Sequence, residues 1–384
     1  MSGPVVSDRE RLHPKKTIDK RSFEYIARSG LAGGLAGISA KTLIAPLDRV
    51  KILFQTNNPH YKKYVGSFKG LGRAMGHIYQ NDGFRGLYQG HSATLLRIFP
   101  YAAIKFVCYE QIRSLLIPGD EYETAARRLL AGSLAGVISV YFTYPLDLIR
   151  VRLAFETNHH SINFGPGKLW YILTKIYNEK PRLELNTGGE IQKGSQSWLA
   201  RAVYYWRVSE RFPVLVRLGN FYRGFVPTIM GMVPYAGVSF YSHDLLHDLM
   251  RSKMLSPYTV MPSSNSPHNN EMKKGKRHQV SVKSKSSFDH RVPLNTWAQL
   301  LAGGLAGMTA QAAAYPFEVI RRRMQVGGVV QGGAFLGLSQ TIKIIFQERG
   351  LKGFYVGLGI GFLKVVPMFA CSFYVYERSK NWLL

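Results

Sequence analysis

The sequence predicts an all-α membrane protein with six transmembrane helices, and three observations carry this prediction. Six apolar stretches of about 20 residues interrupt a chain whose mean hydropathy is only −0.08. Glycine and alanine are frequent inside these stretches, as is typical of helices that pack within a bilayer. One charged motif also recurs three times, each time at the end of an apolar stretch. The six stretches are residues 29–47, 92–109, 129–148, 225–241, 298–317 and 356–374.

The recurring motif is a proline followed two residues later by an acid and five residues later by a base. Its three copies begin at Pro46, Pro145 and Pro316. A charge inside an apolar helix is costly unless it meets an opposite charge, so we expect the three copies to converge on one centre. A soluble helical repeat protein is the alternative, but its helices would rarely contain this much internal glycine.

Alignment of the copies divides the chain into three repeats and two inserts. A second motif, an aromatic residue shortly before a glycine, ends at Gly90, Gly224 and Gly357. Each repeat should therefore contain an odd span, an amphipathic loop helix and an even span. We predict a disordered tail at 1–22, repeat 1 at 23–117 and repeat 2 at 122–252 with an insert at about 178–211. A disordered basic linker at 253–291 and repeat 3 at 292–384 complete the chain.

Composition excludes several functional classes. The net charge of +27 is spread over helix ends, loops and single positions within apolar stretches, which favours anionic lipid and an anionic solute over nucleic acid. Cys108 and Cys371 are isolated and have neither disulfide nor zinc spacing. The chain has no Gly-x-x-x-x-Gly-Lys-Ser/Thr loop and no His-Glu-x-x-His pair. We therefore predict no enzyme activity, no cofactor and no metal site.

The two motifs together resemble those of the mitochondrial carrier family. The family pattern is Pro-x-acid-x-x-base-x-base, followed after a loop by acid-Gly and then aromatic-base-Gly. Repeats 2 and 3 match the first half fully, whereas repeat 1 has Leu53 in place of the last base. Asp82-Gly83 matches acid-Gly, Arg349-Gly350 keeps only the glycine, and Val216-Arg217 keeps neither. The resemblance covers residues 24–384 apart from the inserts.

The resemblance implies the mitochondrial carrier fold, with short matrix helices, in the mitochondrial inner membrane. Both termini would face the intermembrane space. It also implies a matrix gate, in which each acid pairs with the base of the next repeat in some cyclic order, with glutamines as braces. That gate comprises Asp48, Lys51, Asp147, Arg150, Glu318, Arg321, Gln55 and Gln325. Ala154 stands where repeat 2 would have its glutamine.

A second, cytosolic gate is implied by an aromatic-acid-x-x-base motif in the even spans. Its expected members are Tyr109, Glu110, Arg113, Asp244, His247, Tyr376, Glu377 and Lys380. The middle copy departs from the motif, because His243 replaces the aromatic residue and His247 the base. An ordinary histidine is mostly neutral at pH 7, so we expect a weaker cytosolic gate than usual.

The resemblance also places solute contacts on the even spans, about one turn before each proline or its equivalent. These contacts are Arg97, Gly231, Met232 and Lys364, and Tyr235 is a further candidate on the same span as Gly231. Lys41, five residues before Pro46 on the first odd span, is another candidate base. Gly231 followed by an aliphatic residue resembles carriers of adenine nucleotides, and Tyr235 offers a face for base stacking. The bases could instead pair with unrecognised acids or carbonyls, and Gly231 and Tyr235 could serve helix packing alone.

Among family members, the stretches at 40–51 and 90–103 look like the coenzyme A carrier branch, especially its fungal members. Coenzyme A has an adenine and three phosphate groups, which suits several buried bases. We therefore expect coenzyme A transport by alternating access in exchange for an adenine nucleotide. An adenine nucleotide (ATP, ADP or AMP) carrier is the alternative, and a non-transporting membrane scaffold or receptor is the alternative of another class. The expected partners also include anionic lipid such as cardiolipin, and a monomer is expected.

Overall fold

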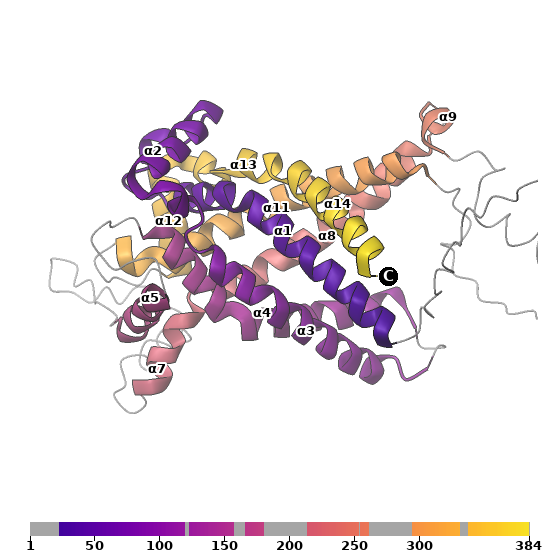
Figure 1. Cartoon of the computed structure of the whole chain (residues 1–384), viewed down its shortest axis with the longest axis horizontal. Coiled ribbons are helices and arrows are strands. Elements are labelled where there is room, and N and C mark those ends of the chain that lie inside the picture. The colour runs from indigo at the N-terminus through magenta and orange to yellow at the C-terminus, as the bar shows by residue number, and fades with distance from the viewer. Residues whose placement is uncertain are drawn as a thin grey trace, which may run out of the picture. The chain divides into compact units, whose positions relative to one another are not determined.

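The computed structural model describes residues 23–119, 123–156, 166–179, 213–252, 254–260, 294–330 and 337–383 (Figure 1). Within these ranges the regular elements are α-helices and short 3-10 turns, with one isolated β-bridge between Val260 and Leu294. The all-α prediction is thus confirmed. The expected tail at 1–22 lies outside the described residues, as do 180–211 of the first insert and 261–291 of the linker.

Each repeat consists of a long odd helix, short elements and an even helix. Repeat 1 contains α1 (Phe23–Gln55), η1 (Lys62–Tyr64), α2 (Phe68–Leu87) and α3 (His91–Leu116). Repeat 2 contains α4 (Ala125–Phe155), α5 (Pro166–Asn178), α7 (Pro213–Gly219), η3 (Asn220–Tyr222) and α8 (Phe225–Met250). Repeat 3 contains α11 (Thr296–Val330), α12 (Leu338–Arg349), η5 (Gly350–Tyr355), α13 (Leu358–Leu363) and α14 (Val365–Leu383).

All six apolar stretches lie largely within helices. The odd helices continue through Pro46, Pro145 and Pro316 into the charged motif, and the last stretch is divided between α13 and α14 at Lys364. Three helical segments are both long and apolar enough to cross a membrane: Arg28–Gln55, Arg127–Phe155 and Leu338–Trp382. Helices α3, α8 and α11 have 26, 26 and 35 residues, which is sufficient length for a span of about 20 residues.

The chain forms two compact units. The first comprises Met1–Ile44 and Val366–Leu384, and so joins the start of α1 to α14. In this unit Ser29 and Tyr376 approach within 3.5 Å through their hydroxyl oxygens, and Lys41 Nζ lies 3.7 Å from Met368 Sδ. The second unit is Ala45–Val365, where α3 packs along α4 and α8 packs along α11 (Figure 1). In both units an even helix therefore packs against the odd helix of the next repeat.

Apolar clusters fix the ends of the odd helices against the short elements of each repeat. In repeat 1, Leu53 is fully buried beside Leu71 and Ile78 of α2. The corresponding bases of repeats 2 and 3, Arg152 and Arg323, each pair with an acid, whereas in repeat 1 the equivalent acid Asp82 pairs with Arg49. A base at position 53 would therefore be buried without that partner. Equivalent clusters join α4 to α5 around Ile172 and α11 to α12 around Ile345.

The beginning of the expected disordered linker differs from the prediction. Residues Ser256–Thr259 form α9, a single helical turn in which the Thr259 hydroxyl donates to the Leu255 carbonyl. Thr259 is buried, and Val260 bridges to Leu294 just before α11. The ordered chain therefore extends at least to residue 260 before the basic part of the linker.

Candidate functional site

The motif acids and bases of the three repeats meet in one ring of ion pairs, called here the inter-repeat ring. Asp48 of repeat 1 lies 2.9 Å from Arg150 of repeat 2, and Glu318 of repeat 3 lies 2.8 Å from Lys51 of repeat 1. Asp147 of repeat 2 pairs with Arg321 of repeat 3. Each acid therefore pairs with the base of the next repeat, which settles the cyclic order that the sequence left open.

Local helix geometry brings these side chains to the ring. The acid and the base of each motif are three residues apart, so both lie on one face of their odd helix. Three glycines with positive φ then begin the even helices and let each even helix approach the next odd helix. An added Cβ would lie 2.8 Å from the Arg150 carbonyl oxygen at Gly90 and 3.0 Å from that of Arg321 at Gly224. At Gly357, it would lie 3.5 Å from Lys51 Cγ.

Two of the three ion pairs are braced by a glutamine and a tyrosine. Gln55 Nε2 donates to Tyr315 Oη at 3.0 Å and to Glu318 at 3.2 Å. Gln325 Nε2 donates to Tyr144 Oη at 3.2 Å and to Asp147 at 3.1 Å. Both glutamines were predicted from the sequence. The two tyrosines were missed, although each stands directly before the proline of its motif, a position that the alignment already contained.

The Asp48–Arg150 pair lacks both braces. The position before the proline of repeat 1 is Ala45, and the glutamine position of repeat 2 is Ala154. Both alanines are buried, with 6% and 1% exposure. Asp48 instead accepts a second ion pair from Lys364 Nζ at 2.7 Å.

The even-helix bases Arg97 and Lys364 belong to the same network. Arg97 Nη1 lies 2.6 Å from Asp147 Oδ1, so the ring acids are the partners that the sequence did not reveal for either base. Arg322, which the sequence analysis did not select, also contacts Asp147 at 3.1 Å. Among the described side chains, six bases thus meet three acids, and positive charge exceeds negative by three. The bases are Lys51, Arg97, Arg150, Arg321, Arg322 and Lys364.

Burial differs sharply within this network. The Asp147 side chain is 2% exposed and that of Lys51 is 5% exposed, whereas Arg97 retains 29%. Removing ions from water costs several kcal/mol each, so the net stabilisation from such pairs is much smaller than their Coulomb attraction. Arg97 is therefore the most exposed base of the network, whereas Lys364, like Arg150 and Arg321, retains 17%.

The other candidate substrate residues are arranged differently. At Gly231 an added Cβ would lie 3.0 Å from Phe317 Cβ, so the close contact between α8 and α11 accounts for this glycine by packing. A Cβ added at Gly136 of α4 would lie 3.4 Å from Met232 Cε. Tyr235 is exposed. Lys41 belongs to the first unit, where its amine contacts Met368.

The residues of the expected cytosolic gate are divided between the two units: Tyr376, Glu377 and Lys380 belong to the first and the others to the second. In the described part of the second unit, Glu110, Arg113, Asp244 and His247 make no ion pair with one another. Arg113 instead pairs with Glu123 at 3.1 Å, in the loop before α4. Hydrogen bonds from Arg128 and from Arg113 lower the pKa of the Glu123 carboxyl. In the first unit, Tyr376 contacts Ser29.

Each repeat has a second ion pair beyond the ring, buried in repeats 1 and 2 and more exposed in repeat 3. The sequence alignment located only one of the three acids. Asp82 pairs with Arg49 at 3.1 Å, Glu348 with Arg323 at 2.8 Å, and Glu179 with Arg152 at 3.0 Å. Arg223 also binds Glu179, at 2.7 Å.

The alignment matched Val216-Arg217 and Arg349-Gly350 to the acid-Gly element, and neither dipeptide contains the acid. In repeat 2 the insert follows the acid, so counting backwards from the aromatic-Gly motif misses it. Counting forwards from the motif proline finds all three, at 36, 34 and 32 residues.

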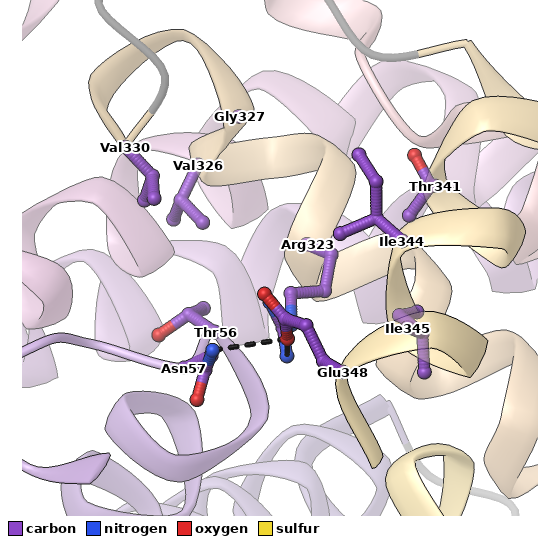
Figure 2. A pocket seen from close by; sticks show the side chains of 10 residues that line it. All are labelled: Thr56, Asn57, Arg323, Val326, Gly327, Val330, Thr341, Ile344, Ile345 and Glu348. Carbon is purple, nitrogen blue, oxygen red and sulfur yellow. Dashed lines mark hydrogen bonds and ion pairs between the residues drawn. The ribbon is translucent and has the colours of Figure 1, made fainter. Parts of the chain in front are cut away.

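A small hollow adjoins this pair in repeat 3. Figure 2 shows Arg323 and Asn57 directed toward Glu348, with Val326 and Ile345 on the apolar walls. Asn57 Nδ2 donates to the Glu348 carboxylate at 3.0 Å. The hollow contains about 390 Å³ of empty space, including space open to solvent. It is lined by Thr56 and Asn57, just after α1, and by residues of α11 and α12.

Sequence comparisons agree with this architecture. The chain is 52% identical to mitochondrial carrier protein LEU5 of Saccharomyces cerevisiae, covering 95% of this chain and 93% of that one. It is 37% identical to human solute carrier family 25 member 16, over 94% of this chain and 90% of the relative. Identity to the mitochondrial coenzyme A transporter SLC25A42 of Xenopus tropicalis is 30%, over 99% and 90% of the two chains.

The sequence pattern described as mitochondrial carrier protein matches residues 23–120, 121–188 and 292–384. These three matches correspond to the three motif copies that build the inter-repeat ring. The coenzyme A transporter is a more distant relative than the other two, so the ranking by itself assigns no solute. Three matched repeats, six bases around three acids, and full-length relatives lead to one conclusion: this chain belongs to the mitochondrial carrier family and is a membrane transport protein.

Proposed function

We propose that this carrier transports coenzyme A, or a closely related adenine-containing polyanion, in exchange for an adenine nucleotide. The observation that carries the proposal is the excess of three positive charges in the network around the inter-repeat ring. An uncompensated positive cluster favours a solute with several negative charges. Coenzyme A, with three phosphate groups, meets this requirement. The 30% identity to a protein named as a coenzyme A transporter adds support.

Arg97 and Lys364 provide a physical link between solute binding and the ring. Phosphate oxygens accept strong, charge-assisted hydrogen bonds from both kinds of base. A solute that takes Arg97 from Asp147 and Lys364 from Asp48 removes one ion pair from each of two ring acids. Because the net stability of buried ion pairs is small, loss of one partner shifts the balance between closed and open states. Solute binding would therefore loosen the matrix gate.

The adenine moiety requires an aromatic or apolar contact beside the bases. Tyr235 is 48% exposed on α8 and offers a face on which a base can stack. Gly231 supports the proposal less than the sequence suggested, because the close approach of Phe317 is by itself a reason for a glycine at this position. The charge excess thus argues for a polyanion more strongly than the remaining residues argue for adenine.

The direct test is uptake by liposomes that contain the purified full-length chain. Labelled coenzyme A is compared with ADP, ATP, phosphate and S-adenosylmethionine, each with coenzyme A or ADP inside. We expect saturable coenzyme A uptake that requires an internal adenine nucleotide. ATP exchange without coenzyme A uptake would favour the adenine nucleotide carrier, and no uptake of any solute would favour a scaffold or receptor.

Variants connect the uptake to the proposed site. Arg97→Gln and Lys364→Gln should each reduce coenzyme A uptake by about tenfold or more, since each removes a charge-assisted contact of about 1.5–3 kcal/mol. Lys105→Gln is the matched control, because Lys105 is an exposed base on the same helix as Arg97. Equal effects at positions 97 and 105 would contradict a specific contact with the solute.

The membrane setting forms part of the same proposal. Six spans would place both termini on one side, and we assign that side to the intermembrane space of the mitochondrial inner membrane. The net charge of +27 favours contact with anionic lipid such as cardiolipin, and the ring is complete within one chain, which favours a monomer. In mitochondria whose outer membrane has been removed and whose inner membrane is intact, added protease should cleave epitope tags at both termini.

A further inference from the structure

We propose that His243 and His247 form a binding site for a divalent transition-metal ion, Zn²⁺ or Cu²⁺, at the end of α8. The two imidazole rings stack with their centroids 4.1 Å apart and an angle of 27° between their planes. Histidines four residues apart on one helix present ring nitrogens to one point in space, an arrangement that metal sites use. The sequence scan looked for His-Glu-x-x-His and passed over this pair, in which Asp244 follows the first histidine.

Accessibility and the neighbouring carboxylate favour metal binding over a buried structural pair. The His243 side chain is 52% exposed and that of Asp244 is 53% exposed, so an ion can reach the site without disturbing the core. Asp244 Oδ1 lies 3.8 Å from His243 Nδ1. This distance is too long for a hydrogen bond, so the carboxylate acts through its negative charge, which favours a cation beside the imidazole.

The ligand set specifies the class of ion. Two imidazole nitrogens suit Zn²⁺, Ni²⁺ or Cu²⁺, with Cu²⁺ bound most strongly, and they do not suit Ca²⁺ or Mg²⁺. No cluster of three or more metal-ligating side chains occurs among the described residues, so solvent must complete the coordination shell. Such an open site binds reversibly, as expected of a site that modulates rather than builds the fold.

The location gives the site a consequence that rests on the proposed transport function. His247 occupies the base position of the cytosolic-gate motif, 22 residues beyond the start of α8 at Phe225 and about 33 Å from it along the helix axis. An imidazole that coordinates a metal is not available to an acid of another repeat. Metal binding should therefore hinder closure of the cytosolic gate and slow transport.

Electron paramagnetic resonance of bound Cu²⁺ tests the site without any transported solute. The full-length protein is purified in detergent with its affinity tag removed, because the tag would itself bind copper. We expect a signal with splitting from two nitrogens in the unaltered protein. His243→Gln and His247→Gln should each remove this signal and weaken Cu²⁺ binding by roughly tenfold or more, since one of two protein ligands is lost.

His77→Gln is the matched control, because His77 is a histidine on α2 whose ring contacts Asn81 at 2.9 Å and not a second histidine of the same helix. This variant should retain the two-nitrogen signal. Persistence of the signal in both α8 variants, or its loss in His77→Gln alone, would overturn the proposal. Since the copper measurement needs no solute, its failure is distinguishable from failure of the coenzyme A proposal.

The effect on transport is measured separately as fractional inhibition by Zn²⁺ in liposomes. Inhibition should be strong in the unaltered protein and at least about tenfold weaker in His243→Gln, which leaves His247 at the base position of the gate motif. Equal inhibition of the two proteins would overturn the link between the metal site and the gate. Addition of a zinc chelator should restore transport, which shows that the inhibition is reversible.

Discussion

The two braced ion pairs of the inter-repeat ring differ instructively from the unbraced third. Beside Glu318 and Asp147, a glutamine donates both to the acid and to the hydroxyl of a neighbouring tyrosine. Around Asp48, the corresponding positions are Ala45 and Ala154. Repeat 1 lacks the tyrosine and repeat 2 lacks the glutamine, yet both losses fall on one pair, because the ring joins the acid of repeat 1 to the base of repeat 2.

The unbraced pair is also the one that shares its acid with Lys364. A candidate solute-binding base therefore stands at the pair that lacks the glutamine and the tyrosine. We infer that the ring opens first at Asp48–Arg150 and last at Asp147, where three arginines and Gln325 converge. The following variants should break or sharpen this comparison, from the largest expected effect to the smallest.

Asp147→Asn should have the largest effect. Three guanidinium groups would lose their shared charge partner, and breaking a buried ion pair costs about 3–5 kcal/mol. The thermal unfolding midpoint in detergent should fall steeply, and more than in Asp48→Asn, which leaves only two bases. Asp244→Asn, at an exposed carboxylate, is the control and should unfold at nearly the original temperature. Equal losses in Asp147→Asn and Asp48→Asn would contradict the proposed asymmetry.

Reversal of one braced pair should come next. Lys51→Glu replaces an ion pair, whose Nζ and Oε1 atoms are 2.8 Å apart, by two neighbouring acids, and Glu318→Lys replaces it by two neighbouring bases. Each single variant should lose transport, whereas the double variant should regain part of the activity and of the unfolding midpoint. A double variant no better than the worse single variant would show that the two residues do not act as a pair.

Removal of a brace should cost less. Gln325→Ala leaves Tyr144, Asp147 and Arg322 each without one hydrogen bond, at about 1–3 kcal/mol in total for buried partners left unsatisfied. Gln55→Ala removes two such bonds and should lower the unfolding midpoint by a smaller amount. Gln111→Ala, on the exposed side of α3, serves as the control. The reverse order of Gln325→Ala and Gln55→Ala would count against this ranking.

Tyr315→Phe should have the smallest measurable effect. It removes the hydroxyl that donates to the Val356 carbonyl at 3.0 Å and accepts from Gln55, while the ring that stacks on Tyr355 remains. The expected cost is about 1 kcal/mol. In a Gln55→Ala background the same change should cost less, because the glutamine is already absent. Additive costs in the double variant would indicate that the two residues brace independently.

Sequence reasoning identified the fold and the ring because these depend on features that recur in register. The three motif copies place each acid and base on one helix face, and the three glycines before the even helices repeat at equivalent positions. Partners outside the matched motif positions were missed, including some that recur, such as Tyr144 and Tyr315. Arg322 has no special place in the motif, and Glu179 is separated from its aromatic-Gly motif by an insert.

The amino-acid sequence by itself determined the all-α class, the repeats, and the residues that must find opposite charges, because burial of charge in apolar helices is costly wherever the helices lie. Only the tertiary structure decided which partners meet. Arg97 and Asp147 are 50 positions apart along the chain, and Lys364 and Asp48 are 316 apart. Such pairs form because each even helix packs against the odd helix of the next repeat, a relation that no local pattern encodes.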